Sequence, residues 1–211
     1  GPFTPGFVYA DASDAGSVGR LAEENGCCAV MMEMVQGEGG VVPLDREFVS
    51  GALKAAEKYE LLVIVDEIQT GNGRTGKLYS WQNFGFTPDI MTTAKGLGGG
   101  LPIGACIFGE RTENVMTPGS HGSTFGGNPV CCAGAVSILK RIDDSLMAGV
   151  MEKSRYITEA LTGTPGVLSI AGMGLMLGIE TERPAAEIVN GCIERGVLVL
   201  TAKNKIRLLP P

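Results

Sequence analysis

Two short apolar runs in this chain each lead to a charged residue that could do chemistry. Asp66 follows the run 61–65, and Lys95 comes shortly after the run 90–93. In open α/β sheets, ligands bind at the carboxyl ends of such strands. An amine beside a buried carboxylate is the pair that a carbonyl cofactor such as pyridoxal phosphate requires. The amine forms a Schiff base, and the carboxylate keeps the pyridinium nitrogen protonated.

Both residues also have ordinary explanations. Most lysines are solvated surface residues, and an aspartate after a strand commonly caps the following turn. The setting of Lys95 favours chemistry, because a predicted buried strand precedes it and the glycine-rich run 96–104 follows it. A lysine in a confined, poorly solvated site loses its proton more readily, and it can then act as a nucleophile and later as a base.

Three further charged residues are candidates for a ligand site. Glu38 lies in a glycine-rich turn after a predicted strand, whereas Glu33 lies inside an apolar run and could simply pair with a basic group. We therefore expect Glu38 to face a ligand. Arg207 lies in a short apolar stretch, and arginine is the best side chain for bidentate recognition of a carboxylate.

The segment 121–129 reads as a turn that runs into a helix. The hydroxyl groups of Ser123 and Thr124, with free backbone N–H groups, could bind a phosphate there. Alternatively, these residues or Asn128 could cap the helix. We expect His121 to be a structural hydrogen-bonding residue.

The run 71–77, Gly-Asn-Gly-Arg-Thr-Gly-Lys, matches the core of a nucleotide-binding P-loop. A P-loop also requires Ser or Thr after the lysine to hold magnesium, and Leu78 occupies that position. Acidic residues separate the run from its strand as well. A glycine-rich turn is therefore the better interpretation, with a nucleotide-binding module at 71–77 as the alternative from another functional class. A non-catalytic piece that only dimerises is a third hypothesis.

The hydrophobic pattern predicts the elements that position these residues. Helices are expected at 15–25, ended by Gly26, and at 45–59, with Asp45 as the N-cap. Apolar strands are expected at 27–35, 61–65, 90–93 and 103–108. Alternation of helices with nearly continuous apolar strands predicts an α/β fold with a largely parallel sheet covered on both faces.

The second half of the chain has a different pattern of predicted elements. A long helical stretch is expected from 130 to 161, with a bend near Asp143-Asp144. A hairpin is expected at 167–170 and 175–180, then a helix with Pro184 in its first turn, then strands at 197–200 and 206–209. We place a domain boundary near residue 145, which gives domains 1–145 and 146–211. Both chain ends look cut, because neither has a closing element.

Composition narrows the classes of function. The 211 residues carry a net charge of −6, and the 17 basic residues are scattered, which argues against a nucleic-acid partner. The six cysteines include adjacent pairs within apolar runs but no C-x-x-C pair, and His121 is the only histidine. We therefore expect buried reduced thiols, no metal site and a cytoplasmic location. No stretch is long enough to predict a membrane span.

Taken together, these segments resemble the class III pyridoxal-phosphate aminotransferases, and within them the acetylornithine and ornithine aminotransferases. The resemblance rests on Gln-Gly-Glu-Gly-Gly-Val at 36–41, Val-Asp-Glu-Ile-Gln-Thr-Gly at 65–71 and Thr-Ala-Lys-Gly-Leu-Gly-Gly-Gly at 93–100. Residues 119–129 and Arg207 continue it in the same order. The resemblance implies fold type I, as in aspartate aminotransferase. That fold has a large cofactor-binding domain with a mostly parallel sheet, and here part of a smaller α+β C-terminal domain follows it.

The resemblance also implies roles around the cofactor. Lys95 would form the Schiff base with pyridoxal 5'-phosphate, and Asp66 would pair with the ring nitrogen. Ile68 would pack on the ring, and Gln69 would hydrogen-bond the ring hydroxyl. Thr124 would bind the phosphate of the cofactor held by the neighbouring subunit of a homodimer.

The remaining implied roles concern substrate. Ser123 would lie near it, Arg207 would bind its α-carboxylate, and Glu38 would mask Arg207 and swing away when required. The implied reaction is amino transfer from N-acetylornithine to 2-oxoglutarate, of the arginine-biosynthesis type, with ornithine or 4-aminobutyrate as alternative donors. The family's chain is longer, so we expect the isolated 211-residue piece to be inactive.

Overall fold

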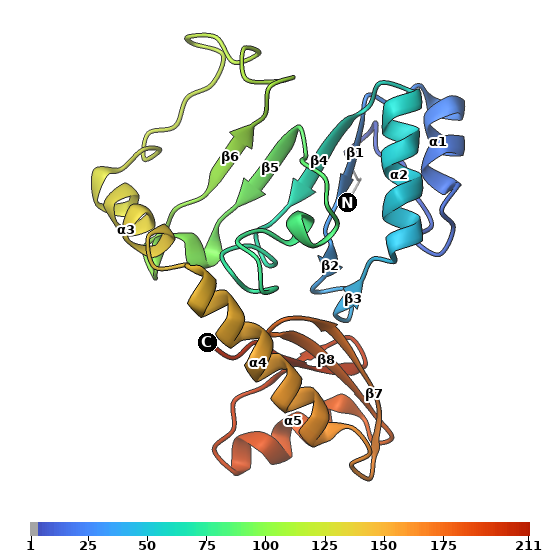
Figure 1. Ribbon diagram of the computed structural model, residues 1–211, viewed down its shortest axis with the longest axis vertical. Coiled ribbons are helices and arrows are strands. Elements are labelled where there is room, and N and C mark those ends of the chain that lie inside the picture. Colours follow the sequence, from blue (N-terminus) through green and yellow to red (C-terminus); the bar gives the residue numbers. More distant parts are fainter. Residues whose placement is uncertain (1–3) are drawn as a thin grey trace.

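The computed structural model describes residues 4–211, which form two four-stranded sheets connected by long helices (Figure 1). The first sheet has the order β1-β4-β5-β6. Its strands are β1 (Ala29–Met32), β4 (Leu62–Asp66), β5 (Ile90–Thr93) and β6 (Ala105–Phe108). The pairs β1–β4 and β4–β5 are parallel and β5–β6 is antiparallel, so the sheet is mostly parallel as predicted.

Two helices, α1 (Ser17–Asn25) and α2 (Arg46–Lys58), pack together beside β1 and β4. The residue that ends α1 and the residue that begins α2 are those expected from the sequence. Gly26 closes α1 in the left-handed conformation, which glycine adopts without a Cβ penalty. The Asp45 carboxylate accepts a 2.6 Å hydrogen bond from the Glu47 backbone N–H and caps α2.

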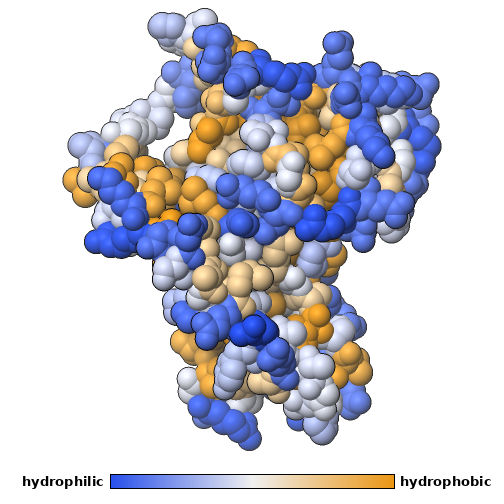
Figure 2. All heavy atoms as spheres, in the orientation of Figure 1, coloured by the Kyte–Doolittle hydropathy of each residue, from blue (hydrophilic) through white to orange (hydrophobic). Residues whose placement is uncertain are grey.

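The expectation that helices cover both faces of this sheet was wrong. Residues 62–108 contain only turns and the 3-10 helices η1 (Ser80–Asn83) and η2 (Lys95–Gly98) between their strands. Met31 of β1 and Cys106 of β6 point to the same face of the sheet; Met31 is 55% exposed and Cys106 is also exposed. Figure 2 shows apolar surface over this part of the molecule. The sheet is therefore open on one side in the described residues, because the connections after β4 and β5 form turns and 3-10 helices instead of covering α-helices.

The cysteines were also predicted wrongly as buried. All six are free thiols; Cys28 and Cys106 are exposed and the others are only partly buried. Cys106 lies on β6, the last strand of the open sheet, where an apolar sequence pattern does not guarantee a covering layer.

The predicted long helical stretch is two helices, α3 (Pro129–Leu139) and α4 (Asp144–Leu161). Asn128 caps α3 and Asp143 caps α4, so the predicted bend is a complete interruption. In Figure 1, α4 runs down to the second sheet. None of the helices in residues 4–211 combines the length and the hydrophobicity needed to cross a lipid bilayer.

The second sheet is antiparallel, with the order β7-β8-β10-β9. Its elements are β7 (Val167–Met173), β8 (Met176–Thr181), α5 (Ala185–Glu194), β9 (Leu200–Ala202) and β10 (Lys205–Leu208). The hairpin β7–β8 was predicted correctly. Pro184 precedes α5 as its N-cap residue rather than entering the first turn, and β9 begins at Leu200 where 197–200 was expected. A two-residue turn at Lys203-Asn204 joins β9 to β10. It pairs Lys205 with Ala202 and Arg207 with Leu200, so the paired part of β9 begins at Leu200.

A small hairpin, β2 (Val35–Gln36) with β3 (Val42–Pro43), lies between the two sheets (Figure 1). The single strand expected at 27–35 is therefore interrupted after Met32. Val35 and Val41 are fully buried and pack against Met176 and Ala202 of the second sheet. This contact docks the glycine-rich turn 37–40 onto the C-terminal part of the chain.

Candidate active site

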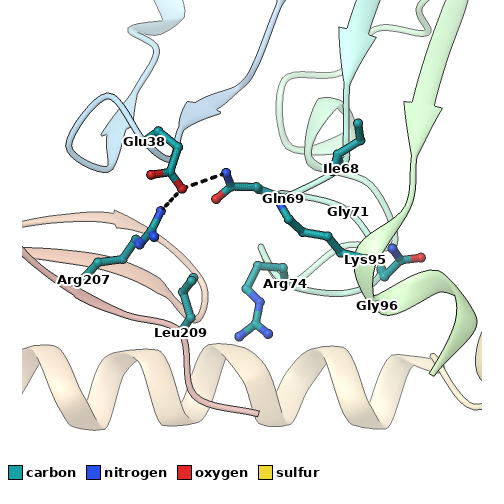
Figure 3. Close-up of a pocket in the computed structure, with 10 residues that line it drawn as sticks. Glu38, Ile68, Gln69, Gly71, Arg74, Lys95, Gly96, Arg207 and Leu209 are labelled. Atoms are coloured by element: carbon teal, nitrogen blue, oxygen red, sulfur yellow. Dashed lines mark hydrogen bonds and ion pairs between the residues drawn. The ribbon is translucent and has the colours of Figure 1, made fainter. Parts of the chain in front are cut away.

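A pocket of about 210 Å³ lies between the two sheets, where β4 and β5 end (Figure 3). Its walls come from three distant parts of the sequence. The lining residues are Glu38, Ile68, Gln69, Gly71, Asn72, Arg74, Lys95, Gly96, Arg207 and Leu209. The pocket thus brings together five of the predicted site residues: Glu38, Ile68, Gln69, Lys95 and Arg207.

Lys95 begins η2, two residues after the end of β5. Its φ angle is +44°, in the left-handed region that costs a non-glycine residue about 1 kcal/mol or more. The side chain extends toward Gln69 and the pocket interior (Figure 3). The chain therefore holds an amine in the pocket by means of a backbone conformation that the surrounding structure must enforce.

Asp66 ends β4, the strand next to β5, and pairs across the ladder with Thr92. Its Oδ1 accepts a 2.8 Å hydrogen bond from the backbone N–H of Ile68, so it also caps the turn that carries Ile68 and Gln69. Asp66 does not line the pocket surface itself. Parallel pairing of β4 and β5 nevertheless brings Asp66 and Lys95 to the same edge of the sheet.

Glu38 and Arg207 form an ion pair at one end of the pocket. Glu38 Oε1 accepts a 2.6 Å hydrogen bond from Arg207 Nη1 and a 3.4 Å hydrogen bond from Gln69 Nε2 (Figure 3). The Arg207 side chain is only 9% exposed, whereas that of Glu38 is 74% exposed. The hydrogen bond and charge of Arg207 lower the pKa of the Glu38 carboxyl. Arg207 is thus a fixed buried cation, and Glu38 is its accessible partner.

Glu33 is half-buried and within electrostatic range of Glu38. Burial raises the pKa of its carboxyl, and the 3.4 Å hydrogen bond from Gly37 N–H opposes that change. The charges of Asp66 and Lys95 also act on Glu33, which places all three groups within electrostatic range. Glu33 is not a lining residue of the pocket.

Ser123 and Thr124 lie outside the pocket. They are exposed residues in the long segment between β6 and α3, which arches away from the sheets (Figure 1). Ser123 Oγ accepts a 3.0 Å hydrogen bond from Gly126 N–H, and Asn128 rather than either hydroxyl caps α3. Within one chain these two residues do not reach Lys95.

Sequence reasoning missed Asn72 and Arg74 as site residues, because it treated 71–77 as a glycine-rich turn, with a P-loop as the alternative. Arg74 donates hydrogen bonds to the carbonyls of Leu175 and Pro210 and points away from Lys95 (Figure 3). Burial lowers the pKa of its guanidinium. The 71–77 turn therefore connects the two sheets, and it leads into η1 rather than the α-helix that a P-loop requires.

Comparison with known proteins is consistent with this geometry. The family model for aminotransferase class III matches residues 12–211. The acetylornithine aminotransferase of Haemophilus ducreyi is 43% identical over 212 residues, which cover all of this chain and 54% of that protein. The corresponding Bacillus subtilis enzyme is 44% identical over 216 residues and is covered to 56%. The chain thus spans about half the length of these curated relatives.

Solved structures show the same likeness. The crystal structure of ornithine aminotransferase from Toxoplasma gondii superposes with a TM-score of 0.92 at 34% identity, covering all of this chain and 53% of that one. The acetylornithine aminotransferase of Elizabethkingia anophelis gives a TM-score of 0.90 at 32% identity, covering all of this chain and 56% of that one. The predicted fold type I architecture is confirmed by these neighbours.

Proposed function

This chain belongs to the class III aminotransferases, and from that membership we propose that the protein containing it transfers an amino group from N-acetylornithine to 2-oxoglutarate with pyridoxal phosphate. Ornithine and 4-aminobutyrate are the alternative donors. The observation that carries the proposal is that the Glu38–Arg207 pair and Lys95 line one pocket. A transaminase with two different substrates needs an amine for covalent chemistry, which Lys95 provides. It also needs a cation that binds a carboxylate and can be shielded, which the Glu38–Arg207 pair provides.

The residues present fit pyridoxal phosphate. Lys95 presents an amine to the pocket, Ile68 offers an apolar side chain, and Gln69 offers an amide, both from the turn after β4. Asp66 lies at the adjacent strand end as the acidic partner for a ring nitrogen. Inside the pocket wall, Asn72 Oδ1 and Arg207 Nε are buried without a hydrogen-bond partner among the described residues, as expected of a surface built to receive a polar ligand. When bound, the cofactor supplies an aldehyde for covalent attachment and a protonated ring that accepts an electron pair.

The protein groups have separate tasks in this proposal. Lys95 Nζ anchors the cofactor and, once displaced, takes a proton from the substrate carbon that bears the amino group. Asp66 would hold its carboxylate beside the ring nitrogen of the bound cofactor. Gln69 would orient the cofactor ring through its amide, and it donates a 3.4 Å hydrogen bond to Glu38. These residues share one turn and one strand edge, so their relative positions are set by the β4–β5 pairing.

Arg207 and Glu38 would separate the two half-reactions. Arg207 is buried on β10, and its guanidinium offers a bidentate site for a carboxylate. Glu38 lies on an exposed turn and masks that charge while the ω-amino donor reacts. For 2-oxoglutarate, Glu38 would rotate toward solvent and leave Arg207 to the substrate.

We also propose a homodimer and a division of the chain at residue 145. The support for the dimer is that Thr124 and Ser123 are exposed on an arching segment away from their own pocket. In a dimer, Thr124 would contact the phosphate of the neighbouring subunit's cofactor. The support for the division is the break between α3 and α4, which separates the two sheets. Residues 1–145 would then belong to the cofactor-binding domain and 146–211 to the smaller domain.

The direct test is to add pyridoxal phosphate to the purified protein that contains this chain, reduce it with borohydride, and map the labelled peptide. The expected result is a label on Lys95 and amino transfer from N-acetylornithine that is faster than from ornithine or 4-aminobutyrate. A label on Lys77 or Lys140 would contradict the site. A faster reaction with ornithine or 4-aminobutyrate would contradict only the choice of donor.

A further inference from the structure

We propose that Asn72 is a positioning residue for Lys95. Its side-chain amide holds the backbone just ahead of the lysine and so sets the direction in which the amine enters the pocket. The inference rests on the proposed function, because it concerns the lysine of that site. Asn72 lines the same pocket as Lys95 but follows a different strand, β4 instead of β5.

The contact is made by two hydrogen bonds. Asn72 Nδ2 donates to the carbonyl of Ala94 at 3.1 Å and to the hydroxyl of Thr93 at 3.3 Å. The same Ala94 carbonyl accepts a 2.9 Å hydrogen bond from Leu97 N–H, which closes the η2 turn. Asn72 and η2 thus share the acceptor that directly precedes Lys95.

Both residues occupy the left-handed backbone region. The φ angles of Asn72 and Lys95 are +57° and +44°. Asparagine tolerates this conformation, whereas lysine does not favour it, so Lys95 needs neighbours that enforce it. Asn72 is a neighbour suited to that task, because a Cβ at Gly96 would lie 3.7 Å from the Asn72 Cβ. The turn 71–76 and the start of η2 are therefore packed against one another on both sides of Lys95.

The amide can face in only one direction. Thr93 is 2% exposed, so water does not readily replace the Asn72 donor at that hydroxyl. Turning the amide over would place Oδ1 against the Ala94 carbonyl, two acceptors facing each other. In the observed orientation, Oδ1 is buried without a partner among the described residues. The donor contacts to Ala94 and Thr93 therefore fix the orientation of the amide.

A simpler explanation is that Asn72 is present only because the turn needs a residue that tolerates positive φ. Asn72→Gly separates the two explanations, since glycine keeps the turn and lacks the amide. Asn72→Asp keeps the size and the tolerance for positive φ but replaces the donor with an acceptor. Asn83→Ala is the matched control, because Asn83 Nδ2 also donates to a threonine hydroxyl at 3.3 Å, on Thr75, which does not line the pocket.

The experiment uses the protein that contains this chain, with two measurements that need no turnover. Hydrogen exchange reports on the Leu97 amide, and reductive methylation with formaldehyde, without cofactor, reports on the Lys95 amine relative to Lys77 in the same digest. For Asn72→Gly and Asn72→Asp we expect several-fold faster exchange at Leu97 and an altered methylation ratio. We also expect kcat to fall by about ten- to a hundredfold with little change in KM, the scale of a misplaced reacting group. Asn83→Ala should change none of these values.

Wild-type exchange and methylation in Asn72→Gly would overturn the proposal and leave Asn72 as a turn residue only. If the glycine variant does not fold, Asn72→Asp supplies the same measurements and the same criterion. A borohydride label on another lysine would instead refute the proposed function, and the exchange and methylation results would still stand as a separate test of the Asn72 contact.

Discussion

Glu38 and Arg207 are 169 positions apart in the sequence, and a 2.6 Å hydrogen bond between Oε1 and Nη1 joins them at the mouth of the Lys95 pocket. One partner is 9% exposed and the other 74%. This asymmetry supports the proposed gate, in which the exposed glutamate would move and the buried arginine would stay in place. The contact also joins the turn 37–40 of the β2–β3 hairpin to β10 of the second sheet.

The first prediction tests this gate. Arg207→Lys should weaken 2-oxoglutarate binding far more than binding of the ω-amino donor, because a lysine cannot make the bidentate contact with a carboxylate. Apparent affinities for both substrates would measure the difference. Arg183→Lys is the control, since Arg183 is a surface residue that pairs with Glu187. Equal losses for the two substrates would assign Arg207 a structural role only.

The second prediction concerns Lys95. Lys95→Ala should lower turnover by several orders of magnitude and remove the borohydride label, because no other amine lines the pocket. Lys77→Ala, at an exposed position on the adjoining turn, should leave both unchanged. A Lys95→Ala variant that keeps its label would show that another lysine does the chemistry.

The third prediction concerns Asp66. Asp66→Asn should lower the rate of a single half-reaction by roughly a hundredfold or more, the scale of losing one preorganised charge, while the hydrogen bond to Ile68 N–H survives. Stopped-flow absorbance would follow that step. Asp45→Asn is the control, because asparagine caps a helix as well as aspartate does. A near-normal rate in Asp66→Asn would reduce Asp66 to a turn cap.

The fourth prediction concerns pH and Glu33. Burial raises the pKa of this carboxyl in the folded state above its ordinary value of 4.5. The folded state therefore binds the proton more tightly, and stability from this group falls as pH rises through the folded pKa. Glu33→Gln removes that penalty, so its melting temperature should exceed that of the unmodified protein at pH 7. The difference should shrink or reverse at pH 4. Calorimetric scans at the two pH values would measure it, and a pH-independent difference would contradict the assignment.

The fifth prediction concerns Glu67, which is fully buried beside the site. Its carboxylate accepts 2.6 Å hydrogen bonds from the hydroxyls of Thr70 and Ser80 and a 3.0 Å hydrogen bond from Trp81 N–H. Glu67→Ala leaves three donors without an acceptor and should lower the free energy of unfolding by about 3 kcal/mol or more. Glu67→Gln retains an acceptor and should cost clearly less. Denaturant titration of both variants is the measurement, and equal losses would contradict the hydrogen-bond explanation.

Much of the local structure was predictable from sequence because it depends on local interactions. The capping side chains of Asp45 and Asn128 set where α2 and α3 begin, and Gly26 sets where α1 ends. Apolar runs identified β4 and β5 nearly to the residue. Parallel pairing of those two strands then brings Asp66 and Lys95 to one sheet edge, as the sequence pattern implied. The family resemblance supplied the roles that spacing alone left open.

The tertiary structure decided what depends on contacts between distant segments. Sequence alone did not show that one face of the first sheet is open, that Cys106 is exposed, or that Arg74 ties the turn 71–77 to the carbonyls of Leu175 and Pro210. It also did not show that Asn72 holds the carbonyl before Lys95. Periodicity reports whether a segment has an apolar side, but it does not report which distant segment covers that side. The positions of the donors around Lys95 are likewise set by packing between the sheets, which no local pattern encodes.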